Sequence, residues 1–299
     1  MKRINFQLIK YNFVPLLSMS LFITSLNSGS NGNCYYVGNE SEAVLVDVGI
    51  SCRQVEKRMN RLGLNIQKVK AIFISHEHSD HINGLESLIK KYHFPVYITP
   101  PTLKNGGLQL EENLLKNFTA HQPVCIGELE ITAFPKFHDA SDPFSFIVSS
   151  HKVCIGIFTD IGTPCKQLIH YFQKCHAAFL EANYDDKMLE EGNYPFHLKR
   201  RIRGGKGHLS NQQALELFIS YRPVFMTHIL LSHLSHNNNS PELVENLFTN
   251  HAGNVKVVIA SRYQETELYH IRESAVSPSV LAKRSKLIST SIQLAFSFS

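Results

Sequence analysis

The chain has no pair of cysteines in the C-x-x-C spacing that thiol zinc sites commonly use. Its six cysteines are scattered, which argues against a cysteine zinc site and favours reduced, packed thiols in a cytoplasm. No apolar run is long enough to span a membrane. Internal repeats and an interdomain linker are also absent. These absences favour a cytoplasmic globular protein over a membrane or repeat protein.

What the sequence does contain is typical of a folded chain rich in histidine. The 299 residues suffice for one large α/β domain, or two small ones, with a proper core. Hydrophobic residues make up 43% and charged residues 18%, which is ordinary globular composition. The formal net charge of +5 permits a polyanionic partner without requiring one. The unusual number is the 16 histidines, so the question is whether they cluster.

The two ends of the chain differ from its middle. The apolar stretch 13–26 follows several basic residues, which permits a secretory signal. Pro15 interrupts that stretch and no small-residue cleavage site follows it, so a strand at 21–26 is favoured instead. We therefore expect three parts: an N-terminal extension at 1–19, a single domain at 20–271, and a loosely ordered serine-rich tail at 272–299.

Apolar runs of strand length alternate with helical patterns throughout this domain. Strands are predicted at 21–26, 34–37, 43–48, 71–75, 96–99, 129–134, 144–149, 152–158, 177–180, 224–231, 255–259 and 265–270. Helices are predicted at 52–62, 82–92, 164–172, 196–203, 210–220 and 241–250. Early strands give way to mixed strands and helices in both halves, which predicts two sheets packed together with helices outside.

Four potential metal ligands follow the buried strand at 71–75 within six residues: His76, His78, Asp80 and His81. A loop at a strand end can point such side chains into one small space. Imidazole and carboxylate groups suit zinc, manganese or iron, and burying four of them without a cation would be costly. The alternative is a solvated polar loop, which this dense pattern disfavours.

Six residues are too few to fill the coordination shells of two ions, so further ligands must come from later strand ends. His138, Asp160 and His233 each lie at or just after a predicted strand. Taken alone, each has an ordinary alternative, such as a capping aspartate or a histidine that bonds the backbone.

Over residues 20–270 the chain resembles the metallo-β-lactamase superfamily in the order of its acidic and histidine residues: Asp47, His76, His78, Asp80, His81, His138, Asp160 and His233. The resemblance implies an α/β fold, a four-layer αββα sandwich, with two metal ions at one edge of its sheets. It also implies ligand roles: His76, His78 and His138 for the first ion, Asp80, His81 and His233 for the second, and Asp160 between them. Asp47 would orient the ligand loop rather than bind metal.

The loop Gly207-His208-Leu209-Ser210-Asn211 resembles that of tRNase Z-like nucleases, in which a histidine protonates the leaving oxygen. His208 is therefore a candidate general acid, and Asp80 is the other candidate catalytic residue. The alternative is that Ser210 or Asn211 caps the next helix and His208 is a surface residue. The presence of both Asp80 and Asp160 resembles the ligand pattern of phosphodiesterases rather than that of the antibiotic-degrading relatives.

A basic segment immediately precedes this loop. Its five cations suit contact with a phosphate backbone, although a solvated helix face is the alternative. The residues concerned are Lys199, Arg200, Arg201, Arg203 and Lys206.

Several segments resemble the YycJ-like (WalJ) group of bacterial metallo-hydrolases, among them 26–34, 180–183, 207–211 and 233–235. One departure is Tyr184, which stands where the group commonly has a histidine, so any contribution from that position is in doubt. The resemblance implies DNA-directed, exonuclease-like activity linked to repair or replication.

The leading interpretation is a dinuclear phosphodiesterase acting on DNA, with a hydroxide between the ions as nucleophile. Zinc is the expected metal and manganese the alternative. A carbonyl hydrolase, either a lactonase or a thioesterase, is the second interpretation and predicts a largely apolar pocket. A binding protein with little turnover is the third. The sequence leaves the oligomeric state open.

Overall fold

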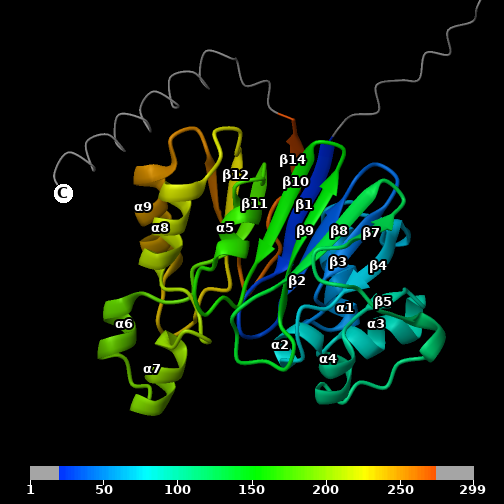
Figure 1. The fold of residues 1–299 in the computed structure, drawn as a ribbon, viewed down its shortest axis with the longest axis horizontal. Coiled ribbons are helices and arrows are strands. Elements are labelled where there is room, and N and C mark those ends of the chain that lie inside the picture. Colours follow the sequence, from blue (N-terminus) through cyan, green and yellow to red (C-terminus); the bar gives the residue numbers. More distant parts are fainter. Residues whose placement is uncertain (1–19, 274–299) are drawn as a thin grey trace, which may run out of the picture.

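The structure is a computed structural model that describes residues 20–273 (Figure 1). The predicted extension at 1–19 and residues 274–299 of the predicted tail lie outside the described residues. Ser20 pairs with Arg272, so the predicted domain boundary at 271 falls inside a strand. None of the described helices is long and apolar enough to cross a membrane.

Two mixed sheets, each of seven strands within residues 20–273, form the middle of the fold. In spatial order the first sheet contains β14 (Tyr269–Arg272), β1 (Ser20–Asn27), β2 (Cys34–Gly38), β3 (Ala43–Val46), β4 (Val69–Phe73), β5 (Val96–Tyr97) and β6 (Leu115–Lys116). The second contains β13 (Lys256–Ile259), β12 (His228–Ser232), β11 (Ala177–Glu181), β10 (Val153–Phe158), β9 (Phe144–Ser150), β8 (Leu129–Pro135) and β7 (Pro123–Ile126).

Strand direction places the functional loops at one edge. Strands β3 to β6 run parallel to one another, and so do β10 to β13, whereas the remaining neighbours are antiparallel. The carboxyl ends of parallel strands meet at a common edge of a sheet, where ligand sites of α/β proteins usually lie. In Figure 1 this is the lower edge, where α2 (Ser79–Ile82), α6 (Asp186–Glu191) and α7 (Phe196–Arg203) are found.

Hydrophobic side chains make three buried layers. One layer lies between the sheets, where Phe73 meets Phe146 at a centroid distance of 5.7 Å. Helices α1 (Cys52–Arg61) and α3 (Leu85–Tyr92) cover the outer face of the first sheet. Helices α5 (Lys166–Phe172), α8 (Asn211–Tyr221) and α9 (Pro241–Ala252) cover the outer face of the second. The predicted four-layer αββα order is therefore confirmed.

The predicted helix at 82–92 is two helices, α2 and α3, separated at Asn83 and Gly84. The reason is a close approach to the loop after β3. The Gly84 amide donates to Val48 O at 2.9 Å, and a Cβ on Gly84 would lie 1.8 Å from Ile50 O. Shorter elements complete the fold: η1 (Ile66–Lys68), α4 (Pro100–Asn105) and η2 (Glu112–Leu114).

One buried cation joins three distant parts of the chain. Arg58 of α1 is only 6% exposed, and its guanidinium donates to Leu26 O at 2.7 Å and to Asn27 Oδ1 at 2.6 Å. It also donates to Tyr263 O at 3.1 Å. The side chain thus ties the end of β1 to the loop after β13.

We predict that Arg58→Met lowers the free energy of unfolding by about 2–4 kcal/mol, because it leaves buried acceptors without donors. Denaturant unfolding followed by circular dichroism measures the loss. The matched control is Arg53→Met on the same helix, where the side chain is exposed, and it should change stability by less than about 0.5 kcal/mol. Equal losses in the two variants would show that the buried network does not stabilise the fold.

Candidate metal centre

The potential ligands gather at the edge where parallel strands end. His76 and His78 follow β4, Asp160 lies two residues after β10, and His233 directly follows β12. His138 enters from the segment after β8. Of these side chains, His76, His138, Asp160 and His233 are buried. The structure therefore brings together residues that are far apart in sequence.

Three residues of the site, each at the end of a strand, have left-handed backbones. Asp47, Asp160 and His233 have φ values of 61°, 55° and 57°. Such values are uncommon for residues other than glycine and tend to persist where the surrounding structure enforces them. Each turns the chain sharply just after a buried strand, so the backbone itself aims the side chain.

The first group of ligands consists of three imidazoles. His78 Nδ1 lies 3.1 Å from His76 Nε2 and 3.2 Å from His138 Nε2. Burial lowers the pKa of His138 to about 4 and that of His76 well below its usual range. Both rings are therefore uncharged at neutral pH and have lone pairs available for a cation.

The second group mixes carboxylates and imidazoles. Asp80 Oδ2 lies 3.2 Å from His233 Nε2 and 3.4 Å from His81 Nε2. Burial by itself would lower the pKa of His233, but the charge of Asp160 and the hydrogen bonds that the ring donates to the carboxylates of Asp80 and Glu181 raise it to about 10. Protons on such imidazoles and a divalent cation are alternative ways of balancing these carboxylates.

Asp160 stands between the two groups. Its Oδ2 lies 3.1 Å from His81 Nε2, and its Oδ1 lies 3.8 Å from His138 Nε2 and 3.5 Å from His233 Nε2. Among residues 20–273, buried Oδ2 makes no well-oriented hydrogen bond, although the His81 imidazole lies within ion-pair distance. A buried carboxylate oxygen without a well-oriented donor is costly, and a cation would satisfy it. The residues present therefore fit divalent metal ions, with ligand atoms within 4.8 Å of one another in each group.

Asp47 supports this cluster from behind. Its carboxylate accepts hydrogen bonds from the Ser75 amide and hydroxyl, both at 2.8 Å, and lies 2.7 Å from His81 Nδ1. Asn33 Nδ2 donates to Asp80 Oδ2 at 3.1 Å. Such contacts fix which imidazole nitrogen faces the site.

Glu181 is a site residue that the sequence analysis missed. It is fully buried, and its Oε1 lies 2.8 Å from His208 Nδ1 and 3.1 Å from His233 Nδ1. Its Oε2 accepts from the amides of Ile161 and Leu209. Although burial opposes ionisation, the charges and hydrogen bonds of the two histidines lower the pKa of Glu181 to about 2. A glutamate ending an apolar strand was the available signal.

His208 lies beside the cluster. Its ring centroid is 5.4 Å from that of His138 and 5.3 Å from that of His233. Ser210 does cap α8, as the alternative interpretation expected, and it forms a capping box with Gln213. Capping nevertheless leaves the His208 side chain held against Glu181 at the site. Tyr184 is buried, and its backbone pairs with that of Ser210.

The basic segment divides into paired and unpaired cations. Arg201 forms an ion pair with Asp139, next to His138, whereas Lys199 and Arg203 bond Glu190. The side chains of Arg200 and Lys206 are exposed and make no hydrogen bond or ion pair within residues 20–273. The loop after α7 also packs on the Asp160 loop, since a Cβ on Gly162 would lie 2.4 Å from Gly205 O.

Comparison with known proteins gives both family and fold matches. The Metallo-beta-lactamase superfamily model matches residues 28–155. The chain is 34% identical over 230 residues to exodeoxyribonuclease YycJ of Bacillus anthracis, covering 75% of this chain and 86% of that protein. It is 30% identical, with the same coverage, to exodeoxyribonuclease WalJ of Streptococcus pneumoniae.

Among solved structures, the metallo-beta-lactamase fold protein YhfI from Bacillus subtilis superposes with a TM-score of 0.65. It is 16% identical and covers 84% of this chain and 99% of its own. At that identity the match speaks for the fold alone, and it agrees with the layer order described above.

We predict that Glu181→Gln weakens the affinity for at least one divalent ion by about 10- to 100-fold, because the amide no longer balances and orients His233. Competition with a chromogenic chelator measures the affinity, and mass spectrometry of the purified chain measures the metal content. Exposed Glu216 on α8 offers the matched control, Glu216→Gln, which should retain wild-type affinity. Unchanged metal affinity in folded Glu181→Gln would contradict a supporting role for Glu181.

Proposed function

The chain belongs to the YycJ-like (WalJ) group of the metallo-beta-lactamase superfamily, and from this premise we propose that it is a metal-dependent phosphodiesterase that degrades DNA from strand ends. The observation that carries the proposal is His208, fixed by Glu181 beside a cluster of metal-ligating side chains. Relatives named exodeoxyribonuclease support DNA as the substrate.

We assign two ions to this cluster. His76, His78 and His138 would hold the first ion, and Asp80, His81 and His233 the second. Asp160 would contact both, which its place between the two groups supports. Zinc is the proposed metal, because imidazoles outnumber carboxylates, and manganese is the alternative. When bound, two such ions lower the pKa of water and stabilise charge on a phosphoryl group.

His208 is the proposed general acid. Glu181 holds Nδ1 of the imidazole, so Nε2 is the atom that can carry a proton towards the leaving oxygen. The His208 side chain is 19% exposed, which allows proton exchange with solvent while the ring stays fixed.

Phosphate contacts are assigned to the basic segment. Arg200 and Lys206 are the primary candidates because they are exposed and unpaired within residues 20–273. Arg201, held next to His138 by its ion pair with Asp139, would contact phosphate at the edge of the site. Lys199 and Arg203 would add to the positive electrostatic potential there. These cations are superfluous for a lactone or thioester substrate, so a carbonyl hydrolase is the weaker proposal. The proposed place of action is the cytoplasm, in DNA repair or replication.

Cleavage of 5′-end-labelled linear duplex DNA, with zinc or manganese added, tests this function. We predict metal-dependent loss of label by the wild type and none by Asp80→Ala, because that variant lacks a ligand of the second ion. The product ladder gives the polarity. An RNA strand of the same sequence runs in parallel. A metal-loaded wild type that spares both nucleic acids and hydrolyses a thioester or lactone would contradict the proposal.

We predict that His208→Gln lowers kcat on DNA by about 100-fold or more, because the leaving oxygen then departs without a proton. A p-nitrophenyl phosphodiester separates this role from a structural one, since p-nitrophenolate departs without protonation. The variant should cleave that substrate nearly as fast as wild type. An equal loss on both substrates would show that His208 positions other groups.

The salt dependence of substrate binding tests the basic segment. We predict that Arg200→Ala raises KM and reduces the slope of log KM against log salt by about 0.7 on single strands or 0.9 on duplex DNA, because one phosphate contact is lost. Arg53→Ala, an exposed arginine on α1, is the matched control and should leave the slope unchanged. Identical slopes in the two variants would show that Arg200 makes no contact with phosphate.

A further inference from the structure

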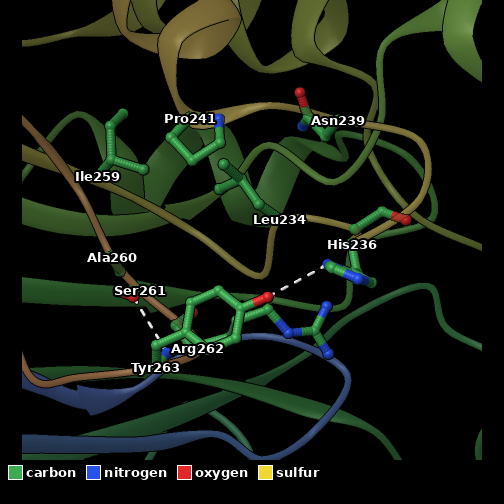
Figure 2. A pocket seen from close by; sticks show the side chains of 11 residues that line it. Leu234, His236, Asn239, Pro241, Ile259, Ala260, Ser261, Arg262 and Tyr263 are labelled. Atoms are coloured by element: carbon green, nitrogen blue, oxygen red, sulfur yellow. Dashed lines mark hydrogen bonds between the residues drawn. The ribbon is translucent and has the colours of Figure 1, made fainter.

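A concave site lies beside the loop that follows His233, and Figure 2 shows the side chains that line it. It is a pocket of about 330 Å³, at the lower end of the roughly 300–1,000 Å³ range of small-molecule sites. The loops after β12 and β13 form its walls, with the start of α9 between them. Its lining includes Leu234, His236, Pro241, Ile259, Arg262 and Tyr263.

Chain connectivity and hydrogen bonds join this pocket to the metal ligands. Leu234 directly follows His233, and Ser28, which also lines the pocket, accepts a hydrogen bond from the His233 amide at 2.7 Å. Asn31 Nδ2 in the same loop as Ser28 donates to Arg262 O at 2.9 Å. Strands β12 and β13 are parallel neighbours, so the pocket opens at the same sheet edge.

The walls suit a flat aromatic group. Leu234, Pro241 and Ile259 provide apolar surface, and the Tyr263 side chain stands beside them with 70% of its surface exposed. The backbone of Tyr263 is nevertheless fixed, because its amide donates to Ser261 Oγ at 3.0 Å and its carbonyl accepts from buried Arg58. An exposed aromatic ring on a fixed backbone is a stacking platform for bases.

The pocket also contains an unsatisfied donor. Arg262 Nη1 is buried and has no hydrogen-bond partner within residues 20–273. A buried guanidinium nitrogen without an acceptor is costly, so the Arg262 side chain would gain by turning Nη1 towards a ligand that carries acceptor atoms. His236 lies near the Arg262 guanidinium, and its Nδ1 is 3.4 Å from the Tyr263 hydroxyl (Figure 2). Ring nitrogens and carbonyl oxygens of nucleobases are acceptors of the required kind.

The loop that lines the pocket also contacts the segment before the basic helix. Asn237, next to His236, donates through Nδ2 to the Tyr194 hydroxyl at 2.9 Å, two residues before α7. The Asp185 amide donates to Asn238 O at 2.8 Å in the same loop. The pocket, the metal ligands and the basic segment are therefore joined at one sheet edge, so a strand held by its phosphates at α7 could present a base to the pocket.

We propose that this pocket binds the unpaired nucleobase of the nucleotide next to the scissile phosphate, with Tyr263 stacking on the base and Arg262 donating to its edge. This inference rests on the proposed function, because it assumes a nucleic-acid strand at the metal centre. It adds a base-binding subsite that requires a frayed or single-stranded end. Duplex ends would then be degraded more slowly than single strands.

Tyr263→Ala tests the subsite, with Tyr263→Phe as the variant that keeps the ring. We expect Tyr263→Ala to raise KM for single-stranded DNA by roughly 5- to 150-fold, the equivalent of about 1–3 kcal/mol of stacking, while kcat changes little. Tyr263→Phe should behave like wild type. Exposed Tyr221 at the end of α8 gives the control Tyr221→Ala, which should not change KM.

Binding is measured separately from cleavage. A phosphorothioate-linked oligonucleotide carries 2-aminopurine at one terminal position, because stacking on an aromatic ring quenches the fluorescence of this base. We expect quenching by the wild type and by Tyr263→Phe, at one of the two strand ends, and none by Tyr263→Ala. An abasic residue at the same position should raise KM for the wild type and leave that of Tyr263→Ala unchanged.

The outcomes separate the two proposals. Efficient DNA cleavage with no effect of Tyr263→Ala on KM or quenching would overturn the base subsite and leave the nuclease intact. Quenching that depends on Tyr263, without any cleavage of DNA or RNA, would support the subsite and overturn the nuclease. A wild type that neither binds nor cleaves nucleic acid would overturn both.

Discussion

The arrangement of the whole structure depends on balancing negative charge at one sheet edge. Asp47, Asp160 and Glu181 are almost fully buried there, and Asp80 lies beside them. Buried carboxylates without partners would cost several kcal/mol each, so every one needs a cation, a proton or a hydrogen-bond donor nearby. Histidines from later loops supply those partners: His81 follows β4, His208 precedes α8 and His233 follows β12, which ties the order of these elements to the chemistry of the site.

The same edge shows how the backbone fixes the geometry. Left-handed residues at the ends of β3, β10 and β12 turn their side chains inward immediately after a buried strand. Because the turn is part of the backbone, it fixes the direction in which each Cα–Cβ bond leaves the chain. The strain is held by the packed sheets on either side, as is common where function requires an unfavourable conformation. The base pocket uses the next strand, β13, and so shares this rigid support.

The sequence indicates a candidate cluster where the residues are close along the chain, and it gives little indication where they are far apart. His76, His78, Asp80 and His81 fall within six residues, so their pattern alone indicated a cluster. His138, Asp160 and His233 gained weight only through the family resemblance. Glu181 was missed because its partners, His208 and His233, lie 27 and 52 residues further along the chain. A single glutamate at the end of a strand does not reveal such partners.

The sequence by itself determined most of the strand and helix pattern, two packed sheets with helices outside, and the close spacing of His76, His78, Asp80 and His81, because side-chain periodicity and local spacing specify these features. The tertiary structure decided which distant residues converge. It interrupted a continuous helical pattern at Gly84, where the backbone of Ile50 approaches too closely for a side chain. It also paired Arg201 with Asp139, left Arg200 exposed, and built a pocket from loops more than 200 residues apart. These outcomes depend on sheet order and loop packing, which no local pattern records.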